Sequence, residues 1–184
     1  IACQQGHTEI ATALIAAGAN VNHAADAGVT PLHIACLEGH TEIATALIAA
    51  GAKVNQARDN GATPLMFACG KGDTENQIAT ALIAAGAKVN QAMDGGFTPL
   101  YIACEEGHTE IVAALIAAGA KVNQAQDDGI TPLYTACRNN HLSTVQLLWS
   151  YGADRTDPNG ETAEEVAAEF GNDEVHAWLV RSQQ

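Results

Sequence analysis

The sequence is poor in aromatic residues, in basic residues and in long apolar runs, and each shortage excludes a class of protein. Only 4% of the 184 residues are aromatic, so the core cannot be built on large rings. Eight Lys and Arg stand against 21 Asp and Glu, and a net charge of −13 is a poor match for DNA or RNA. The longest apolar stretches reach about ten residues, whereas a membrane-spanning helix needs roughly twenty. We therefore expect no nucleic-acid binding and no membrane insertion.

The N-terminus lacks the marks of secretion. It begins Ile-Ala-Cys-Gln-Gln, with neither a basic start nor an apolar signal core. It also lacks an initiator Met, and we expect further sequence upstream. The five cysteines are an odd number without a Cys-x-x-Cys pair, unlike a disulfide framework or a zinc knuckle. We expect reduced, mostly buried thiols in an intracellular, cytoplasmic protein; the alternative is a metal ladder or a redox relay.

What the chain does contain is small residues, 37 Ala and 17 Gly, in a repeating pattern. Spacings of 33, 33, 35 and 33 residues separate the cysteines, which are Cys3, Cys36, Cys69, Cys104 and Cys137. The tetrad Thr-Pro-Leu-x, followed by an Ala-Cys pair, opens at Thr30, Thr63, Thr98 and Thr131. Residues 43–57 and 78–92 are identical. A fixed period of this length predicts a stack of repeated units.

Each unit has the pattern of two short helices. The Thr30 hydroxyl can cap the first helix, and Pro31 fits the first helical position, where a missing N–H costs nothing. We expect this helix to stop at Gly39 in the left-handed conformation and the next to begin near Thr41. Apolar residues at helical spacing follow. Because alanine lets helices approach closely, the sequence predicts stacked helix–turn–helix units.

These motifs resemble those of the ankyrin repeat family, whose period is about 33 residues and whose signature contains T-P-L-H-x-A. Residues 30–35 read TPLHIA and match the signature completely, while three further copies match except at the His. The resemblance covers essentially the whole chain. It implies an all-α ankyrin-repeat solenoid of stacked helix–turn–helix units with short β-hairpin or loop tips.

We expect a single ankyrin-repeat domain over residues 1–184. Its units are a partial repeat at 1–24, full repeats at 25–57, 58–92, 93–125 and 126–154, and a C-terminal capping repeat at 155–184. The capping repeat is rich in acids, as expected of a unit whose outer side faces water.

Two units depart from the regular spacing. We place an extra pair of residues at Asn76-Gln77, and a shortened last hairpin around Asp157-Pro158-Asn159. Four residues of the capping repeat are expected to face inward: Phe170, Val175, Trp178 and Leu179.

No motif in the sequence indicates catalysis. It has no H-E-x-x-H, no phosphate loop and no nucleophile elbow. One loop step recurs with a histidine, at His7, His40, His108 and His141. Recurrence favours an architectural role, bonding the backbone of the adjacent turn, over catalysis or metal binding. We expect a protein that is not an enzyme and that needs no cofactor or metal.

A second recurrent polar residue is the asparagine of the Val-Asn steps, namely Asn22, Asn55, Asn90 and Asn123. We expect these side chains to hold the hairpin backbone. The family resemblance also suggests modification by asparaginyl hydroxylases. Lys53, Lys88 and Lys121 stand where such sites usually have an acid, which argues against it.

The repeats differ from one another mainly at the hairpin tips and on the first helices. In ankyrin proteins these elements line a concave groove that binds partners, so the resemblance places a site there. The residues predicted to bind a partner are Asp59, Asn60, Met66, Lys71, Asp94, Phe97, Tyr101, Glu105, Asp127, Asp128, Ile130, Tyr134 and Arg138.

The aromatic members of this set are the expected energetic centre, because aromatic residues are enriched at interface hot spots. Phe97, Tyr101 and Tyr134 would form an apolar patch with Met66 and Ile130, ringed by acids. The alternative is that Tyr101, Tyr134 and Met66 replace the bracing His of the signature and lie partly buried.

The predicted function is a non-enzymatic, monomeric scaffold that binds a partner protein or peptide in the groove. The acids beyond those needed in turns would favour a basic partner surface. One alternative is a targeting or regulatory segment of a larger enzyme or effector. The other is a structural or engineered spacer array without a specific partner; the copied blocks fit this, whereas the irregular spacings favour a natural origin.

Overall fold

The computed structural model describes residues 1–72 and 77–182, and their regular structure is helical. The α-helices are α1 (Thr8–Ala16), α2 (Pro31–Glu38), α3 (Thr41–Ala49), α4 (Pro64–Lys71), α5 (Gln77–Ala84), α6 (Pro99–Glu105), α7 (Thr109–Ala117), α8 (Pro132–Arg138), α9 (Leu142–Ser150), α10 (Ala163–Glu169) and α11 (Asp173–Arg181). A 3-10 turn covers Asp26–Gly28. Within these described residues no strand forms, so the expected β-hairpin tips are loops; one isolated bridge joins Thr156 and Thr162. The predicted all-α class is confirmed.

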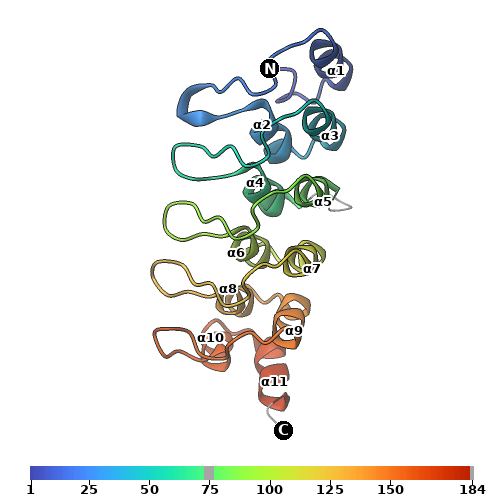
Figure 1. The fold of residues 1–184 in the computed structure, drawn as a ribbon. Helices are drawn as coiled ribbons and strands as arrows, with labels where there is room; N and C mark the ends of the chain where they lie inside the picture. Colours follow the sequence, from blue (N-terminus) through green and yellow to red (C-terminus); the bar gives the residue numbers. More distant parts are fainter. Residues whose placement is uncertain (73–76, 183–184) are drawn as a thin grey trace. The chain divides into compact units, whose positions relative to one another are not determined.

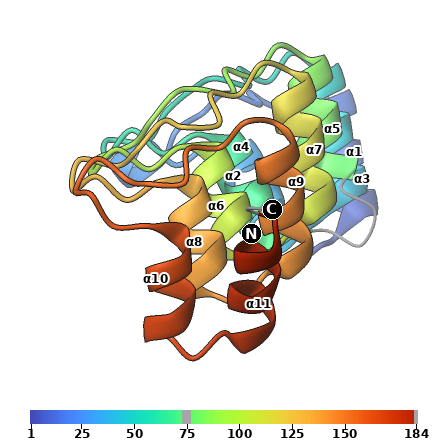
Figure 2. The same ribbon diagram turned by 90° about the horizontal axis from the view of Figure 1, so that it is seen from below.

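The helices divide into two compact units, Ile1–Asp94 and Gly95–Gln184. In the first unit α1 packs against α3 and α2 against α4, and in the second unit α8 packs between α6 and α10. Within each unit the first helices of the pairs form one row and the second helices another (Figures 1 and 2). The loops that connect successive pairs project on the side of the first helices, so tips and first helices share a face of each unit.

The first helices begin and end as the repeated motif predicts. The Thr98 hydroxyl accepts a hydrogen bond of 3.1 Å from the backbone N–H of Tyr101, and Pro occupies the first helical position. Gly39, which follows α2, has φ 76°, a left-handed conformation that favours glycine. Local chemistry at each end therefore sets the helix length.

The core of each unit lies between the two rows of helices. The second helices contribute an Ile and a Leu at helical spacing, such as Ile43 and Leu47 in α3. The first helices contribute the Ala-Cys pair, and Ala35 and Cys36 have no exposed surface. Burying one such Ile or Leu stabilises the fold by about 1.5–3 kcal/mol.

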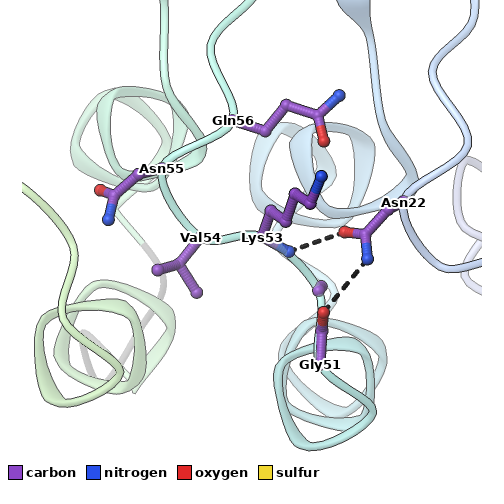
Figure 3. Close-up of a pocket in the computed structure, with 7 residues that line it drawn as sticks. Asn22, Gly51, Lys53, Val54, Asn55 and Gln56 are labelled. Atoms are coloured by element: carbon purple, nitrogen blue, oxygen red, sulfur yellow. Dashed lines mark hydrogen bonds between the residues drawn. The ribbon is translucent and has the colours of Figure 1, made fainter.

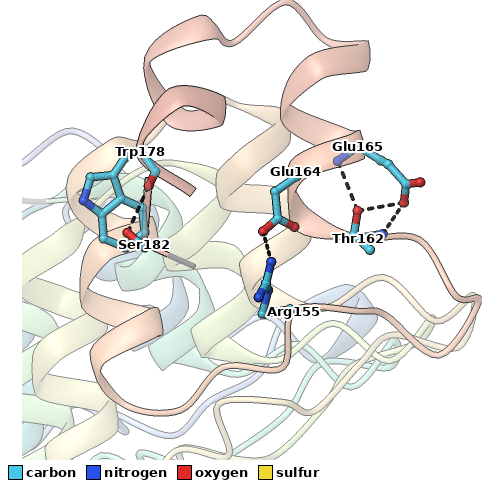
Figure 4. A network of polar contacts seen from close by, with 6 residues as sticks. All are labelled: Arg155, Thr162, Glu164, Glu165, Trp178 and Ser182. Carbon is cyan, nitrogen blue, oxygen red and sulfur yellow. Dashed lines mark hydrogen bonds and ion pairs between the residues drawn. The ribbon is translucent and has the colours of Figure 1, made fainter. Parts of the chain in front are cut away.

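The capping repeat packs through α11, although not as fully as predicted. Val175 and Leu179 are buried, and the Trp178 ring meets Trp149 edge to face at 5.8 Å. The expectation for Phe170 is wrong, because this residue follows the last turn of α10 and its ring lies outside the core. Figure 4 shows polar contacts within the capping repeat, including the ion pair between Arg155 and Glu164.

The departures from regular spacing are accommodated locally. Asn76 lies outside the described residues, and Gln77 begins α5. In the shortened hairpin the buried Asp157 carboxylate accepts hydrogen bonds of 2.9 Å from the backbone N–H groups of Asn159 and Glu161. One carboxylate thus holds the whole turn.

Candidate functional site

The tips of the first unit are fixed by backbone hydrogen bonds, which leaves their side chains at the surface. The Asp59 N–H donates to the carbonyl of Ala27 at 3.1 Å, and the Asp94 N–H donates to the carbonyl of Asn60 at 3.0 Å. The Asn60 side chain also accepts from the N–H of Ala62 at 3.2 Å. Asp59, Asn60 and Asp94 are all exposed. Successive tips therefore form a row with a defined geometry.

The tips of the second unit are tied together in the same way. The Asp127 N–H donates to the carbonyl of Gly95 at 3.1 Å, and Asn159 donates from its amide to the carbonyl of Asp128 at 2.9 Å. The Asp128 carboxylate accepts from the N–H of Ile130 at 3.1 Å. Asp127 and Asp128 are exposed, whereas Ile130 is half-buried. Some of the acidic side chains at the tips therefore stabilise the turns by accepting backbone hydrogen bonds.

The signature histidine, His33, braces one tip against the next. Its Nδ1 accepts from the N–H of Thr30 at 3.1 Å, and its Nε2 donates to the carbonyl of Ala62 at 3.3 Å. Burial lowers the pKa of His33, although the Ala62 carbonyl opposes that effect. The neutral ring is the form that these contacts require, since one nitrogen must accept.

Met66 occupies the bracing position of the next repeat. It is 3% exposed, and its sulfur accepts from the N–H of Thr63 at 3.4 Å. The Thr63 hydroxyl, also buried, has no hydrogen-bond partner among the described residues. Met66 thus fills the space of the histidine but replaces its bonds only in part, as the alternative interpretation describes.

Tyr101 is likewise an interior residue, at 4% exposure. Its ring meets the half-buried Phe97 edge to face at 5.4 Å. Burial is the main reason that the pKa of its phenol is raised, and the neighbouring Thr135 side chain opposes that effect. The predicted apolar patch therefore has Tyr101 beneath its surface.

Tyr134 is the more accessible of the two tyrosines. Its N–H donates to the Thr131 hydroxyl at 3.2 Å, and its side chain is half-buried. The pKa of its phenol is raised by burial and by the negative charge of the neighbouring Glu161 carboxylate. An aromatic ring beside an acid is thus available at this point of the surface.

The ends of the first helices present charged side chains. Lys71 ends α4, Glu105 ends α6 and Arg138 ends α8, and all three are exposed. The Arg138 guanidinium lies 5.1 Å from the centre of the Phe170 ring. Burial and the neighbouring Glu106 raise the pKa of the Glu105 carboxyl, and Arg138 opposes them.

Two exposed apolar residues at the ends of first helices lie outside the set of residues predicted to bind a partner. Leu37, near the end of α2, and Phe170, at the end of α10, are each 44% exposed. The available signal was position, because both occupy the variable helix-end positions that also supply Lys71 and Arg138. The sequence of the capping repeat instead predicts that Phe170 faces inward, onto the preceding repeat.

Two of the four recurrent histidines, His40 and His141, have the predicted architectural role and bond the backbone of the preceding repeat. His141 donates from Nε2 to the carbonyl of Glu105 at 2.9 Å, and His40 to that of Gln4 at 3.5 Å. A Cβ atom on Gly107 would lie 2.4 Å from the His141 ring, so the Gly-His step is a matched pair.

The recurrent asparagines hold the backbone between repeats, also as predicted. Asn22 donates from its amide to the carbonyl of Gly51 at 3.2 Å and accepts from the N–H of Lys53 at 2.7 Å (Figure 3). Asn55 and Asn123 each make the same pair of bonds one repeat further on. The open hollow beside Asn22 in Figure 3 is lined by residues of this junction.

A family model for ankyrin repeats matches the chain in three copies, over residues 1–58, 51–126 and 118–184. The chain belongs to the ankyrin-repeat family. Ankyrin repeats are in general protein–protein interaction modules and typically have no catalytic activity. No match was found among curated proteins.

The described part of this ankyrin-repeat chain offers few groups for redox or metal chemistry. All five cysteines are free thiols, and burial raises the pKa of Cys137 to about 12. Across residues 1–72 and 77–182, no three His, Cys, Asp or Glu side chains are grouped so that they could hold a metal ion. No helix in that part of the chain has the length and apolar character needed to cross a bilayer.

Proposed function

We propose that this ankyrin-repeat protein is a non-enzymatic scaffold that binds a partner protein or peptide through its loop tips and first helices. The observation that carries the proposal is that the tips are ordered by backbone bonds while their side chains stay exposed. Asp59 and Asp127 illustrate this, since their N–H groups are bonded to the preceding tip and their carboxylates face solvent. A surface ordered before binding loses little conformational entropy on association.

The proposed binding form is a monomer, and the proposed partner has a basic surface. Tips and first helices of one chain provide the binding residues without help from a second copy. The exposed acids Asp59, Asp94 and Asp127 have no charged partner among the described residues, and the chain carries a net charge of −13. Such a field speeds the approach of a basic partner. A specific partner typically buries about 800 Å² on such a surface.

Affinity capture with a matched pair of triple variants tests the proposal. The test variant is Asp59→Ala, Lys71→Ala and Asp127→Ala, at exposed tip and helix-end positions. The control is Glu42→Ala, Lys88→Ala and Glu110→Ala, which removes the same charges from exposed positions elsewhere. We expect the test variant to bind the captured partner more weakly than wild type. The loss of binding free energy should be about 2 kcal/mol or more, as for hot-spot residues.

The control variant is expected to retain the partner at wild-type affinity, measured by calorimetry on the identified complex. Equal loss in both variants would assign the effect to net charge and reject the proposed surface. Wild-type protein that captures nothing beyond a matched bead control would instead support the spacer interpretation.

A further inference from the structure

The first helices of the second unit end beside one another. Helix α8 packs against both α6 and α10, and Figure 2 shows the three helices as neighbours in one row. The residues at and after their last turns are exposed: Glu105, Glu106, Arg138, Glu169 and Phe170. We refer to these five residues as the helix-end face.

The acids of this face stand where helix electrostatics disfavours them. The C-terminal end of a helix carries partial negative charge and is stabilised by cations. Arg138 obeys this rule at the end of α8, whereas α6 ends in Glu105 and Glu106 and α10 ends in Glu169. Among the described residues none of these three carboxylates forms an ion pair. The helix dipole therefore disfavours these acids, and a local exception of this kind is expected at functional positions.

The face also contains an exposed apolar ring. Phe170 is 44% exposed, and the Arg138 guanidinium lies against it at 5.1 Å. A large side chain of this kind can anchor a partner's apolar atoms while surrounding charges orient its polar groups. The face thus combines an apolar anchor with three acids and a single base.

We propose that the helix-end face binds a lysine- or arginine-bearing segment of the partner protein. A cation of the partner would lie beside Glu105 at the end of α6, and apolar atoms of a residue further along the segment would cover Phe170, because α8 lies between α6 and α10. The argument for this occupant is charge complementarity, since an acidic segment would meet three exposed carboxylates and a single base. The inference rests on the proposed function and specifies the partner chemistry for one part of that surface.

The test uses two labelled probe peptides on the full chain, (Arg-Leu)5 and (Glu-Leu)5, with binding followed by fluorescence anisotropy in 150 mM NaCl. The face variant is Glu105→Gln, Glu106→Gln and Glu169→Gln. The control variant is Glu110→Gln, Asp173→Asn and Glu174→Gln, which removes three exposed acids from the first turns of α7 and α11. We expect wild type to prefer the basic peptide at least tenfold, the face variant to lose at least tenfold, and the control to lose less than twofold.

Thermal unfolding separates loss of binding from loss of fold. Neutralising acids at helix C-termini relieves an unfavourable interaction, so the face variant should unfold at the same or a higher temperature than wild type. The control removes favourable charges from helix N-termini and should unfold at a lower temperature. Phe170→Ser should also weaken binding of the basic peptide. The variant should still prefer the basic peptide over the acidic one.

Equal losses in the face and control variants would overturn the proposal, because the peptide would then be responding to net charge alone. Equal binding of the two peptides by wild type would overturn it as well. The scaffold function fails separately: a partner lost on Asp59, Lys71 and Asp127 substitution but retained by the face variant would leave that function intact and reject only this inference.

Discussion

At the residue scale, the position after Thr-Pro-Leu shows what the sequence could and could not predict. His33, Met66, Tyr101 and Tyr134 occupy equivalent positions, and the pattern correctly marks them as special. Their environments differ, because His33 bonds two backbone groups, Met66 accepts one backbone bond at its sulfur, and the Tyr101 ring packs against Phe97. Burial at this position depends on residues one repeat away, and a motif read along one repeat does not contain them.

The brace formed by His33 predicts a pH dependence of stability. Because the folded state lowers the pKa of His33 from 6.5, the unfolded chain binds a proton at higher pH than the folded chain does. The stability that the neutral ring contributes is therefore complete above pH 6.5 and is lost as the pH falls below it. We expect the free energy of unfolding, measured in urea, to fall from pH 7.5 to pH 5.5.

The matched variant is His33→Met. It introduces the residue that the chain has at the equivalent position of the next repeat, Met66. We expect it to lower stability at pH 7.5 by about 1–3 kcal/mol, because buried bonding groups lose their partner. Its loss between pH 7.5 and pH 5.5 should be smaller than that of wild type, since the titrating ring is gone. An unchanged pH dependence would contradict the assignment to His33.

At the element scale, helix limits follow from the sequence but helix environment does not. Helices α1 and α3 have identical sequences and equivalent bounds, Thr8–Ala16 and Thr41–Ala49. Yet Ile10 and Leu14 are exposed in α1, whereas their counterparts in α3 are buried. Caps and stop signals are local and are therefore readable, while burial is set by the helices packed alongside. The error at Phe170 has the same origin.

The start of α9 predicts a stabilising substitution. Helices α1, α3 and α7 carry Glu9, Glu42 and Glu110 at their second position, whereas α9 has Ser143 there and no acid in its first turn. Ser143→Glu places a negative charge at the positive end of the helix and should add about 0.3–1 kcal/mol of stability. Glu174 lines the same hollow as Ser143, which puts the expected gain at the lower end of that range.

Ser143→Gln is the control, since it has the same shape without the charge. Thermal unfolding should show a higher midpoint for the Glu variant only, and the difference should shrink in 1 M NaCl, where charges are screened within roughly 3 Å. An equal gain from Gln would assign the effect to side-chain packing or helix propensity.

At the scale of the whole chain, the period was the most informative signal. Repetition at a fixed spacing predicted a stack of repeated units, and the Thr-Pro-Leu motifs at that spacing resembled the ankyrin family, whose model matches along the entire sequence. The division of the helices into the units Ile1–Asp94 and Gly95–Gln184 was not predicted, because the same motifs run through both. The exposed side chains of the candidate surface could be predicted only in part: the acidic tips follow from their turn sequences, whereas the exposure of Phe170 depends on the packing.

The same period distributes the cysteines along the fold and makes them reporters of unfolding. Cys36, Cys69, Cys104 and Cys137 are buried at equivalent positions, while Cys3 is partly exposed. The thiolate is the reactive form, and burial raises the pKa of Cys137 to about 12, so this thiol is both shielded and protonated at neutral pH.

We expect iodoacetamide at pH 8 to label native protein at Cys3 alone, as shown by intact mass and peptide mapping. In rising urea, labelling of Cys36 and Cys69 should follow unfolding of the first unit, and labelling of Cys104 and Cys137 that of the second. Rapid labelling of a second thiol in native protein, or a reductant-dependent change in mass, would contradict a core of buried free thiols.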